Sequence, residues 1–311
     1  MKFLATTFCL VSMLSVFSQA SNFNSQGAWS RNKKEIVMSL GATQFLGDLG
    51  GRNRIGKDYT MGDLNWKSTN FNIGVGFRYR FHKNFATTTM LNIGMLKGDD
   101  ALTDEPIRNA RNLHFRSPLI NLNQRIEWII WANDKTGSRY GMKGGAKNHN
   151  FQLYAFTGIG IAWFNPQARY QGKWVNLRPL KTEGQGMENG PKNYLPITAT
   201  IPAGLGVKFG IAKMWTLGIE AIYLKTFSDY IDDVSGSYYD PAILADRIGP
   251  ASAYLSNPSS TPSLFNPGSQ RGDKDKDAVF YLNIIATKNI TYKNYSSSLK
   301  VKRYKYKRSK F

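Results

Sequence analysis

The chain of 311 residues carries 41 Lys and Arg against 21 Asp and Glu, a formal net charge of +20 at pH 7. Its single cysteine, Cys9, lies in a stretch that a secreted chain would lose, so the remaining chain excludes disulfides, thiolate metal sites and cysteine nucleophiles. Aromatic residues make up 13% of the chain and the mean hydropathy is −0.39, which fits a β-barrel whose membrane signal is spread over short segments.

The first twenty residues have the form of a secretory signal peptide. Lys2 supplies the positive end, residues 3–17 form an apolar run, and residues 18–20 (SQA) provide a small-x-small cleavage site. The run is too short to span a bilayer, and the polar residues that follow argue against the alternative of an N-terminal core helix. Because a secreted chain seldom meets nucleic acid, we expect the basic charge to face anionic lipid headgroups or an acidic protein surface.

Eight segments show the alternation of a β-strand. The clearest is residues 69–81, in which apolar side chains occupy one face from Phe71 to Phe81, while Asn, Gly and Arg occupy the other. Alternate side chains of a strand leave opposite faces, so this period of two predicts a strand. Tilted strands of about 10 residues cross a bilayer. The pattern recurs in residues 35–46, 85–97, 119–131, 150–164, 196–211, 215–227 and 278–288, with more noise in 35–46, 119–131 and 278–288.

The connections between these segments alternate in length. Residues 82–84 and 212–214 are short turns, residues 132–149 are intermediate, and residues 47–68, 98–118, 165–195 and 228–277 are long. Outer-membrane barrels have short periplasmic turns and long outer loops, so the sequence predicts an all-β fold, an eight-stranded antiparallel transmembrane β-barrel with long extracellular loops. We expect a cleaved signal peptide (1–20), a periplasmic segment (21–34), the barrel (35–288) and a basic periplasmic tail (289–311).

The two faces of the strands predict a closed lumen. Aromatic residues near strand ends match the interfacial belts of membrane proteins; they are Trp128, Trp131, Trp163, Trp215 and Tyr223. Eight strands enclose a space that side chains fill, so inward charges must pair or be solvated. We expect a lumenal network with Glu127 and Glu220 as acceptors, formed by Arg78, Arg80, Arg125, Glu127, Lys208 and Glu220. A pore and a catalytic carboxylate pair are the alternatives, which the usual structural role of such charges disfavours.

An acidic stretch, residues 228–244, raises the question of a metal site. Its aspartates lack the one-three-five rhythm and the closing Glu of an EF-hand. Residues 273–277 (DKDKD) have that rhythm, but the sixth and twelfth positions hold Ala278 and Ile284. A solvated acidic loop is therefore favoured over a weak calcium site. The RGD triplet at 271–273 carries almost no weight.

The sequence offers no catalytic constellation. His82, His114 and His149 have no metal-site spacing and no local link to a Ser and an Asp. No helix follows the glycines of GVGF and GIGIAW, so they suit the curved strands of a small barrel rather than a nucleotide site. We expect no enzymatic activity, no cofactor and no metal centre.

The last residues, 289–311, form a basic tail that holds eight Lys and Arg, four Tyr and no acid. A tail that leaves the last strand into the periplasm can meet lipid phosphates or an acidic protein, and a merely solvated tail is the alternative. We expect partner contacts at the tail and at two turns, through Lys300, Lys302, Arg303, Lys305, Lys307, Arg308, Lys83 and Lys213.

The signal peptide, the strand pattern and YIDDVSGSYYDP (230–241), soon after IEAIYLKTF (219–227), together resemble the PorG-type outer-membrane barrel of the type IX secretion and gliding machinery of Bacteroidota. The resemblance covers nearly all of the chain after the signal peptide, and DDVSG-x-YYDP is its most specific element. It implies a structural component that anchors or aligns a periplasmic ring, built from a lipoprotein and a partner subunit, with no cofactor and no catalysis.

The signature of this extracellular loop comprises Asp232, Asp233, Gly236, Asp240 and Pro241, and its aspartates can cap turns around Gly236 and Pro241. The alternative function is a stand-alone small outer-membrane barrel, an adhesin or permeability element that acts through its extracellular loops. Only the anchor should need the periplasmic tail. A lipid-modifying enzyme would need a Ser/His or carboxylate constellation near the outer rim, and the sequence offers none.

Overall fold

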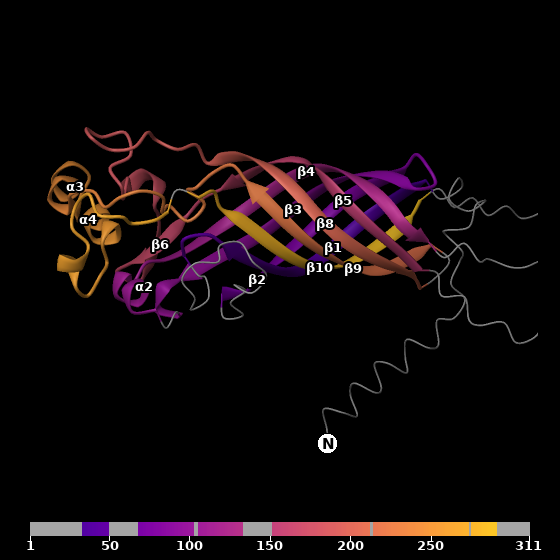
Figure 1. Ribbon diagram of the computed structural model, residues 1–311, viewed down its shortest axis with the longest axis horizontal. Helices are drawn as coiled ribbons and strands as arrows, with labels where there is room; N and C mark the ends of the chain where they lie inside the picture. Colours follow the sequence, from indigo (N-terminus) through magenta and orange to yellow (C-terminus); the bar gives the residue numbers. More distant parts are fainter. Residues whose placement is uncertain are drawn as a thin grey trace, which may run out of the picture.

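The computed structural model describes residues 33–49, 68–102, 105–132, 151–211, 214–273 and 275–290. Eight strands form a closed antiparallel barrel in which neighbours along the chain pair in turn and β1 pairs with β10 (Figure 1). The strands are β1 (Lys34–Leu46), β2 (Asn70–Arg80), β3 (Phe85–Asp99), β4 (His114–Ala132), β5 (Phe151–Phe164), β8 (Ile197–Gly210), β9 (Trp215–Thr226) and β10 (Ala278–Asn289). The predicted eight-stranded antiparallel barrel is confirmed.

The strand boundaries follow the sequence pattern closely, with one exception. β4 begins at His114 rather than at residue 119, because residues 114–118 pair with residues 95–99 of β3. Because proline is uncommon inside a strand, Pro118 argued against including residues 114–118 in the predicted strand. The pairing of β4 with β5 starts only at Leu119, so Pro118, which has no N–H, lies where no β5 partner is lost. Pro202 in β8 likewise lies opposite a gap in the ladder between β5 and β8.

The two ends of the barrel differ. At one, the turn end, residues 81–84 join β2 to β3, and the first and last strands begin and end side by side, since Ile290 N–H donates to Lys34 O (3.0 Å). At the other, the loop end, the described parts of the long connections fold into a cap, on the left in Figure 1. Within the part of the chain that the structure describes, no helix is long and apolar enough to cross a bilayer.

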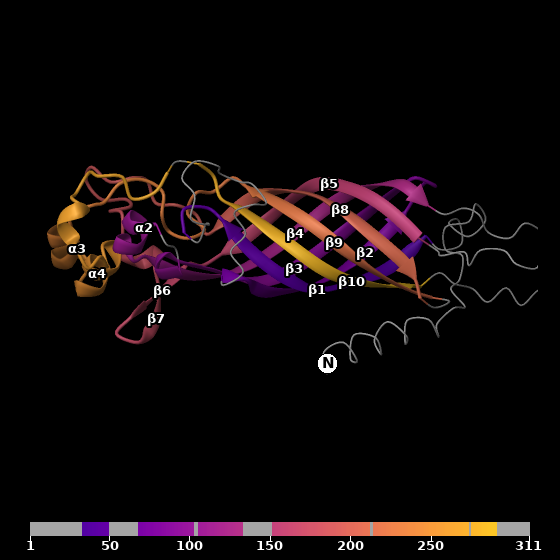
Figure 2. The same cartoon turned by 60° about the horizontal axis from the view of Figure 1, so that its bottom comes forward.

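The cap contains elements that the strand pattern did not predict. They are α2 (Pro106–Arg111), β6 (Gln167–Tyr170), β7 (Lys173–Asn176), α3 (Pro241–Arg247), α4 (Pro250–Ser256) and the 3-10 turns Asp100–Leu102, Arg178–Leu180 and Pro262–Leu264. The β6–β7 hairpin stands out to one side (Figure 2). Asp240 starts α3 as its N-cap, accepting the Ala242 N–H at 2.8 Å, with Pro241 at the first helical position.

The outer wall of the barrel is apolar. Side chains on this face are exposed to an extent rarely tolerated in water: Ile159 is 72% exposed and Phe71 is 61% exposed. Further exposed residues around the wall are Leu40, Ile73, Val75, Leu122, Ile126, Ile161, Leu205, Ile219 and Ile284. Near the turn end, Phe81, Phe85, Trp128, Trp131 and Phe209 are also exposed, as an interfacial aromatic belt requires.

The lumen is filled in three layers. Toward the turn end lie charged side chains, with the buried apolar residues Ile129 and Phe156 among them, and amides follow, in which Asn72 Nδ2 donates to Asn283 Oδ1 (2.9 Å). Toward the loop end the filling becomes apolar, with residues such as Phe45, Phe115 and Leu224 in one buried cluster. The cap covers this apolar layer, so the described lumen is filled from the amides to the loop end.

Candidate functional site

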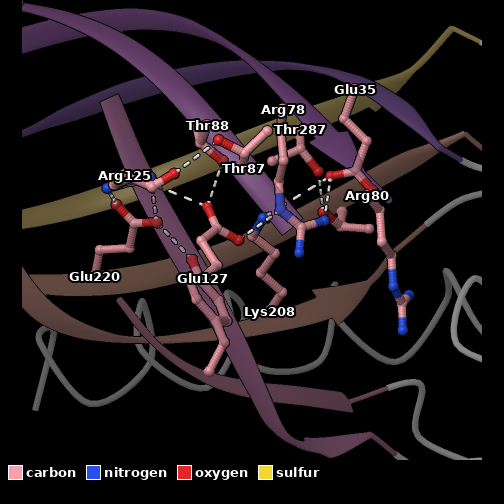
Figure 3. Close-up of polar contacts among 12 residues, drawn as sticks. Glu35, Arg78, Arg80, Thr87, Thr88, Arg125, Glu127, Lys208, Glu220 and Thr287 are labelled. Atoms are coloured by element: carbon pink, nitrogen blue, oxygen red, sulfur yellow. Dashed lines mark hydrogen bonds and ion pairs between the residues drawn. The ribbon is translucent and has the colours of Figure 1, made fainter. Parts of the chain in front are cut away.

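The charged layer of the lumen is the first candidate site. Arg78 on β2 contacts two carboxylates: Nε lies 2.6 Å from Glu127 Oε2, and Nη1 lies 3.1 Å from Glu35 Oε2. Arg125 on β4 reaches across the barrel to β9, where its Nη1 and Nη2 donate to the two oxygens of Glu220 at 3.0 and 2.8 Å. Fork-to-carboxylate geometry of this kind gives strong hydrogen bonds. Together these contacts cross the lumen (Figure 3).

The layer is balanced in charge, because Arg78, Arg125 and Lys208 face Glu35, Glu127 and Glu220. All six side chains are buried, and Glu127 is 0% exposed. Lys208 Nζ lies 3.8 Å from Glu35 Oε2 and 4.9 Å from the ring centre of Tyr154. Thr88 and Tyr154 complete the layer by donating hydroxyl hydrogen bonds to Glu127 and Glu220, each at 2.5 Å. Buried charges are stable only with such pairing.

Five of the six residues expected in the lumen lie in this network, and Arg80 does not. Its side chain is buried but points away from the others (Figure 3), and Nη2 donates to the main-chain oxygen of Lys83 in the turn that follows. Glu35 is a member that the sequence analysis left out. The outward face of Ile36, Met38 and Leu40 was the available signal, because it places Glu35 on the inward face.

Two buried arginines hold the cap together. Arg111 at the end of α2 pairs with Asp100 and donates to the main-chain oxygens of Asp48 (3.0 Å) and Arg271 (2.6 Å). Arg271 donates to Glu183 Oε1 (2.9 Å) and to the main-chain oxygen of Asp233 (2.7 Å). Glu183 in turn accepts the N–H of Ser235 at 2.9 Å and that of Gly236 at 3.3 Å. These contacts join connections that are far apart in sequence into one body.

Two aspartates of the acidic stretch are buried, which corrects the expectation that the loop is solvated. Asp232 and Asp233 are both 0% exposed. Asp233 accepts hydrogen bonds from Thr182 Oγ1 (2.6 Å) and the Tyr194 hydroxyl (2.5 Å), while Asp232 Oδ1 accepts the Val234 N–H (3.0 Å). The turn-capping role expected for Asp232 and Asp240 is therefore present. The sequence could not show burial, because it depends on Glu183, Tyr194 and Arg271 from other parts of the cap.

A group of carboxylates lies at the loop end of the barrel, next to the ends of the neighbouring strands β1, β10 and β9. One oxygen each from Asp48, Asp229 and Asp273 lies within 4.8 Å of the others. Burial raises the pKa of Asp48 to about 8, against the lowering effects of the Asp273 N–H and Arg111. Burial likewise raises the pKa of Asp229 to about 7. Burial, and then the charges of Asp277 and Asp48, raise the pKa of Asp232 well above its ordinary value.

Of the expected contact residues at the turn end, only Lys83 lies within the described residues. Lys83 is half-buried in the β2–β3 turn. Lys213 and the tail residues Lys300, Lys302, Arg303, Lys305, Lys307 and Arg308 lie outside the described residues, as do the signal peptide and most of the periplasmic segment. The barrel itself ends at Asn289, one residue beyond the predicted boundary.

Comparison with known proteins finds no matching family model and no matching curated protein. Among solved structures, a major outer membrane protein from Thermus thermophilus has a TM-score of 0.35 at 11% identity, covering 82% of this chain and 98% of that chain. The attachment invasion locus protein Ail of Yersinia pestis has a TM-score of 0.33 at 10% identity, covering 82% and 98%. Neisserial surface protein A has a TM-score of 0.34 at 6% identity, covering 83% and 97%. Likeness this low carries no argument about activity.

Proposed function

We propose that this chain is an integral outer-membrane protein whose barrel serves as a closed structural platform rather than as a channel or an enzyme. The observation that carries the proposal is the charged layer, which fills the lumen from Glu35 and Arg78 on one wall to Glu220 on the other. The apolar outer wall supports a lipid environment, since its exposed side chains would be costly in water. Two short turns and an intermediate connection at one end, with long loops at the other, support a periplasmic turn end and an extracellular cap.

The more specific role that we propose is that of an anchor in a type IX secretion and gliding machine. In this role the turn end and the basic tail would hold a periplasmic ring, built from a lipoprotein and a partner subunit, beneath the outer membrane. The support is the sequence DDVSG-x-YYDP (232–241) and the charge of the tail. A stand-alone barrel that acts through its cap is the second candidate, and the well-packed cap with its buried arginines favours it.

The closed lumen predicts little ion conductance. The purified full chain, inserted into planar bilayers, should give no current steps above those of a small plugged barrel, because the charged layer crosses the lumen and a buried apolar cluster fills it toward the loop end. The double variant Arg125→Ala/Glu220→Ala removes the pair that crosses the lumen without changing the net charge, and we expect it to conduct more than the original chain. Large steps from the unaltered chain would contradict the closed platform.

The anchor role predicts that partners depend on the tail. Affinity purification from detergent-solubilised outer membranes should recover a lipoprotein and a second periplasmic subunit with the full chain. A chain that ends at Ile290 keeps all of β10 and its contact with Lys34, and it should lose these partners. If the partners are recovered with both forms, the contact lies at the turns and not at the tail. Heat-modified migration on gels would show whether the barrel is folded. If both forms are folded and neither brings down a partner, the stand-alone candidate is favoured.

A further inference from the structure

The carboxylates at the mouth of the barrel come from three segments that the topology forces together. β1, β10 and β9 are consecutive neighbours in the barrel, so their outer ends lie side by side. Asp48 follows β1, Asp229 and Asp232 follow β9, and Asp273 and Asp277 precede β10. Asp48 also binds the β9–β10 connection directly, since both of its carboxylate oxygens accept the Asp273 N–H at 3.1 Å. Gly272 lies so close that a Cβ there would collide with Asp48 Oδ2.

These acids have few protein partners. Among the described residues, none of the five makes an ion pair with a Lys or Arg. Arg111, whose charge acts on Asp48, gives its hydrogen bonds to Asp100 and to main-chain oxygens instead. Negative charges gathered in this way repel one another, and burial increases the repulsion.

A buried oxygen without a partner adds an independent observation. Asp232 is 0% exposed, and its Oδ2 has no hydrogen-bond partner among the described residues, although its Oδ1 accepts the Val234 N–H. The charges that act on this carboxylate most strongly belong to Asp277, Asp48 and Asp229, so it lies beside the cluster. Asp229 Oδ1 is also buried and unpartnered. A buried carboxylate oxygen costs free energy unless a donor or a cation satisfies it.

We propose that Asp48, Asp229 and Asp273 bind a calcium ion at the loop end of the barrel, with the buried carboxylate of Asp232 adding negative charge nearby. Oxygens bound to one Ca²⁺ at about 2.4 Å lie at most about 4.8 Å apart, and the three carboxylate oxygens lie within 4.8 Å of one another. Calcium accepts six to eight oxygen ligands in flexible geometry, so main-chain oxygens and water can complete the shell, whereas Mg²⁺ requires a tight octahedron.

The bound ion would fasten the start of the β1–β2 connection to both ends of the β9–β10 connection. The cap should therefore open less often when calcium is bound. The sequence disfavoured this site because the ligands do not form one motif: they come from residues 48, 229 and 273, and only the closure of β1 onto β10 and the pairing of β10 with β9 unite them.

The test uses the full chain, refolded in detergent free of lipopolysaccharide, so its outcome does not depend on membrane side or on partners. Calorimetric titration with CaCl₂ should show one saturable site with a dissociation constant of about 10⁻⁴–10⁻³ M, the range of extracellular calcium modules. Asp229→Asn and Asp273→Asn should each weaken calcium binding at least tenfold, because asparagine has nearly the shape of aspartate but no charge. Asp246→Asn is the matched control, on an exposed position of α3, and should bind normally.

A second measurement covers the case in which a variant fails to fold. In the unaltered chain, Ca²⁺ should slow chymotrypsin cleavage of residues 228–277, and Mg²⁺ at the same concentration should not. Absence of saturable Ca²⁺ binding by the unaltered chain would overturn the proposal. So would equal weakening by Asp246→Asn, or tighter binding of Mg²⁺ than of Ca²⁺.

Discussion

Replacing Glu127 by Ala should lower the free energy of unfolding of the barrel by about 3–5 kcal/mol, the usual cost of removing one partner from a buried ion pair. Glu127 is 0% exposed and accepts from Arg78 and Thr88, with Arg125 at 3.6 Å. The substitution leaves two guanidinium groups in a closed lumen with a single carboxylate each, Glu35 for Arg78 and Glu220 for Arg125. Both arginines are buried, Arg78 at 1% and Arg125 at 2% exposure, so neither guanidinium group is hydrated in place of the lost carboxylate.

The measurement is urea unfolding of the chain refolded in lipid vesicles. Glu188→Ala is the matched control: the residue is exposed in the cap and should change stability by no more than about 0.5 kcal/mol. The double variant Arg78→Ala/Glu127→Ala should be more stable than the sum of the two single losses, by about 0.5–3 kcal/mol, because the two side chains interact directly. A loss below about 1 kcal/mol for Glu127→Ala, the value of an exposed pair, would mean that water reaches the lumen.

The lumen was largely predictable because a strand has a strict period of two. Once the apolar residues from Phe71 to Phe81 were assigned to the outer face, Arg78 had to face inward, and the same reasoning placed Arg125, Glu127 and Glu220. What the period could not give was depth along the barrel. Arg80 has the same facing as Arg78 but lies two residue pairs nearer the turn end, where it donates to the Lys83 main chain.

The cap was not predictable in the same way. Its helices have six or seven residues, too few for a helical period to stand out, and its stability comes from contacts between distant segments. The separation in sequence is 88 residues for Arg271 and Glu183, and 160 residues for Arg111 and the Arg271 main chain. Local pattern therefore gave no weight to the RGD triplet, although its arginine, 3% exposed, is central to the packing of the cap.

Replacing Arg271 by Ala should open the cap and leave the barrel intact. Glu183, which is 1% exposed, would lose its only ion pair among the described residues and keep just the N–H groups of the signature loop. The main-chain oxygens of Asp233 and Ser256 would each lose a donor as well. Loss of one partner of a buried pair costs about 3–5 kcal/mol. This cost falls on the cap alone, because none of these contacts involves a barrel strand.

A cost of about 3 kcal/mol raises the open population of the cap about 100-fold, since each 1.4 kcal/mol is a factor of ten. Cleavage of a transiently opened segment follows that population when closing is faster than cutting, so chymotrypsin should cut residues 228–277 about 100-fold faster. Arg247→Ala removes an arginine side chain from an exposed position on α3, and chymotrypsin should cut this variant at the rate of the unaltered chain. Heat-modified migration on gels should stay unchanged in both variants. Equal cutting rates for the two variants would show that the cap does not depend on the Arg271–Glu183 pair. Loss of the barrel with Arg271→Ala would show that the cap and the barrel fold as one unit.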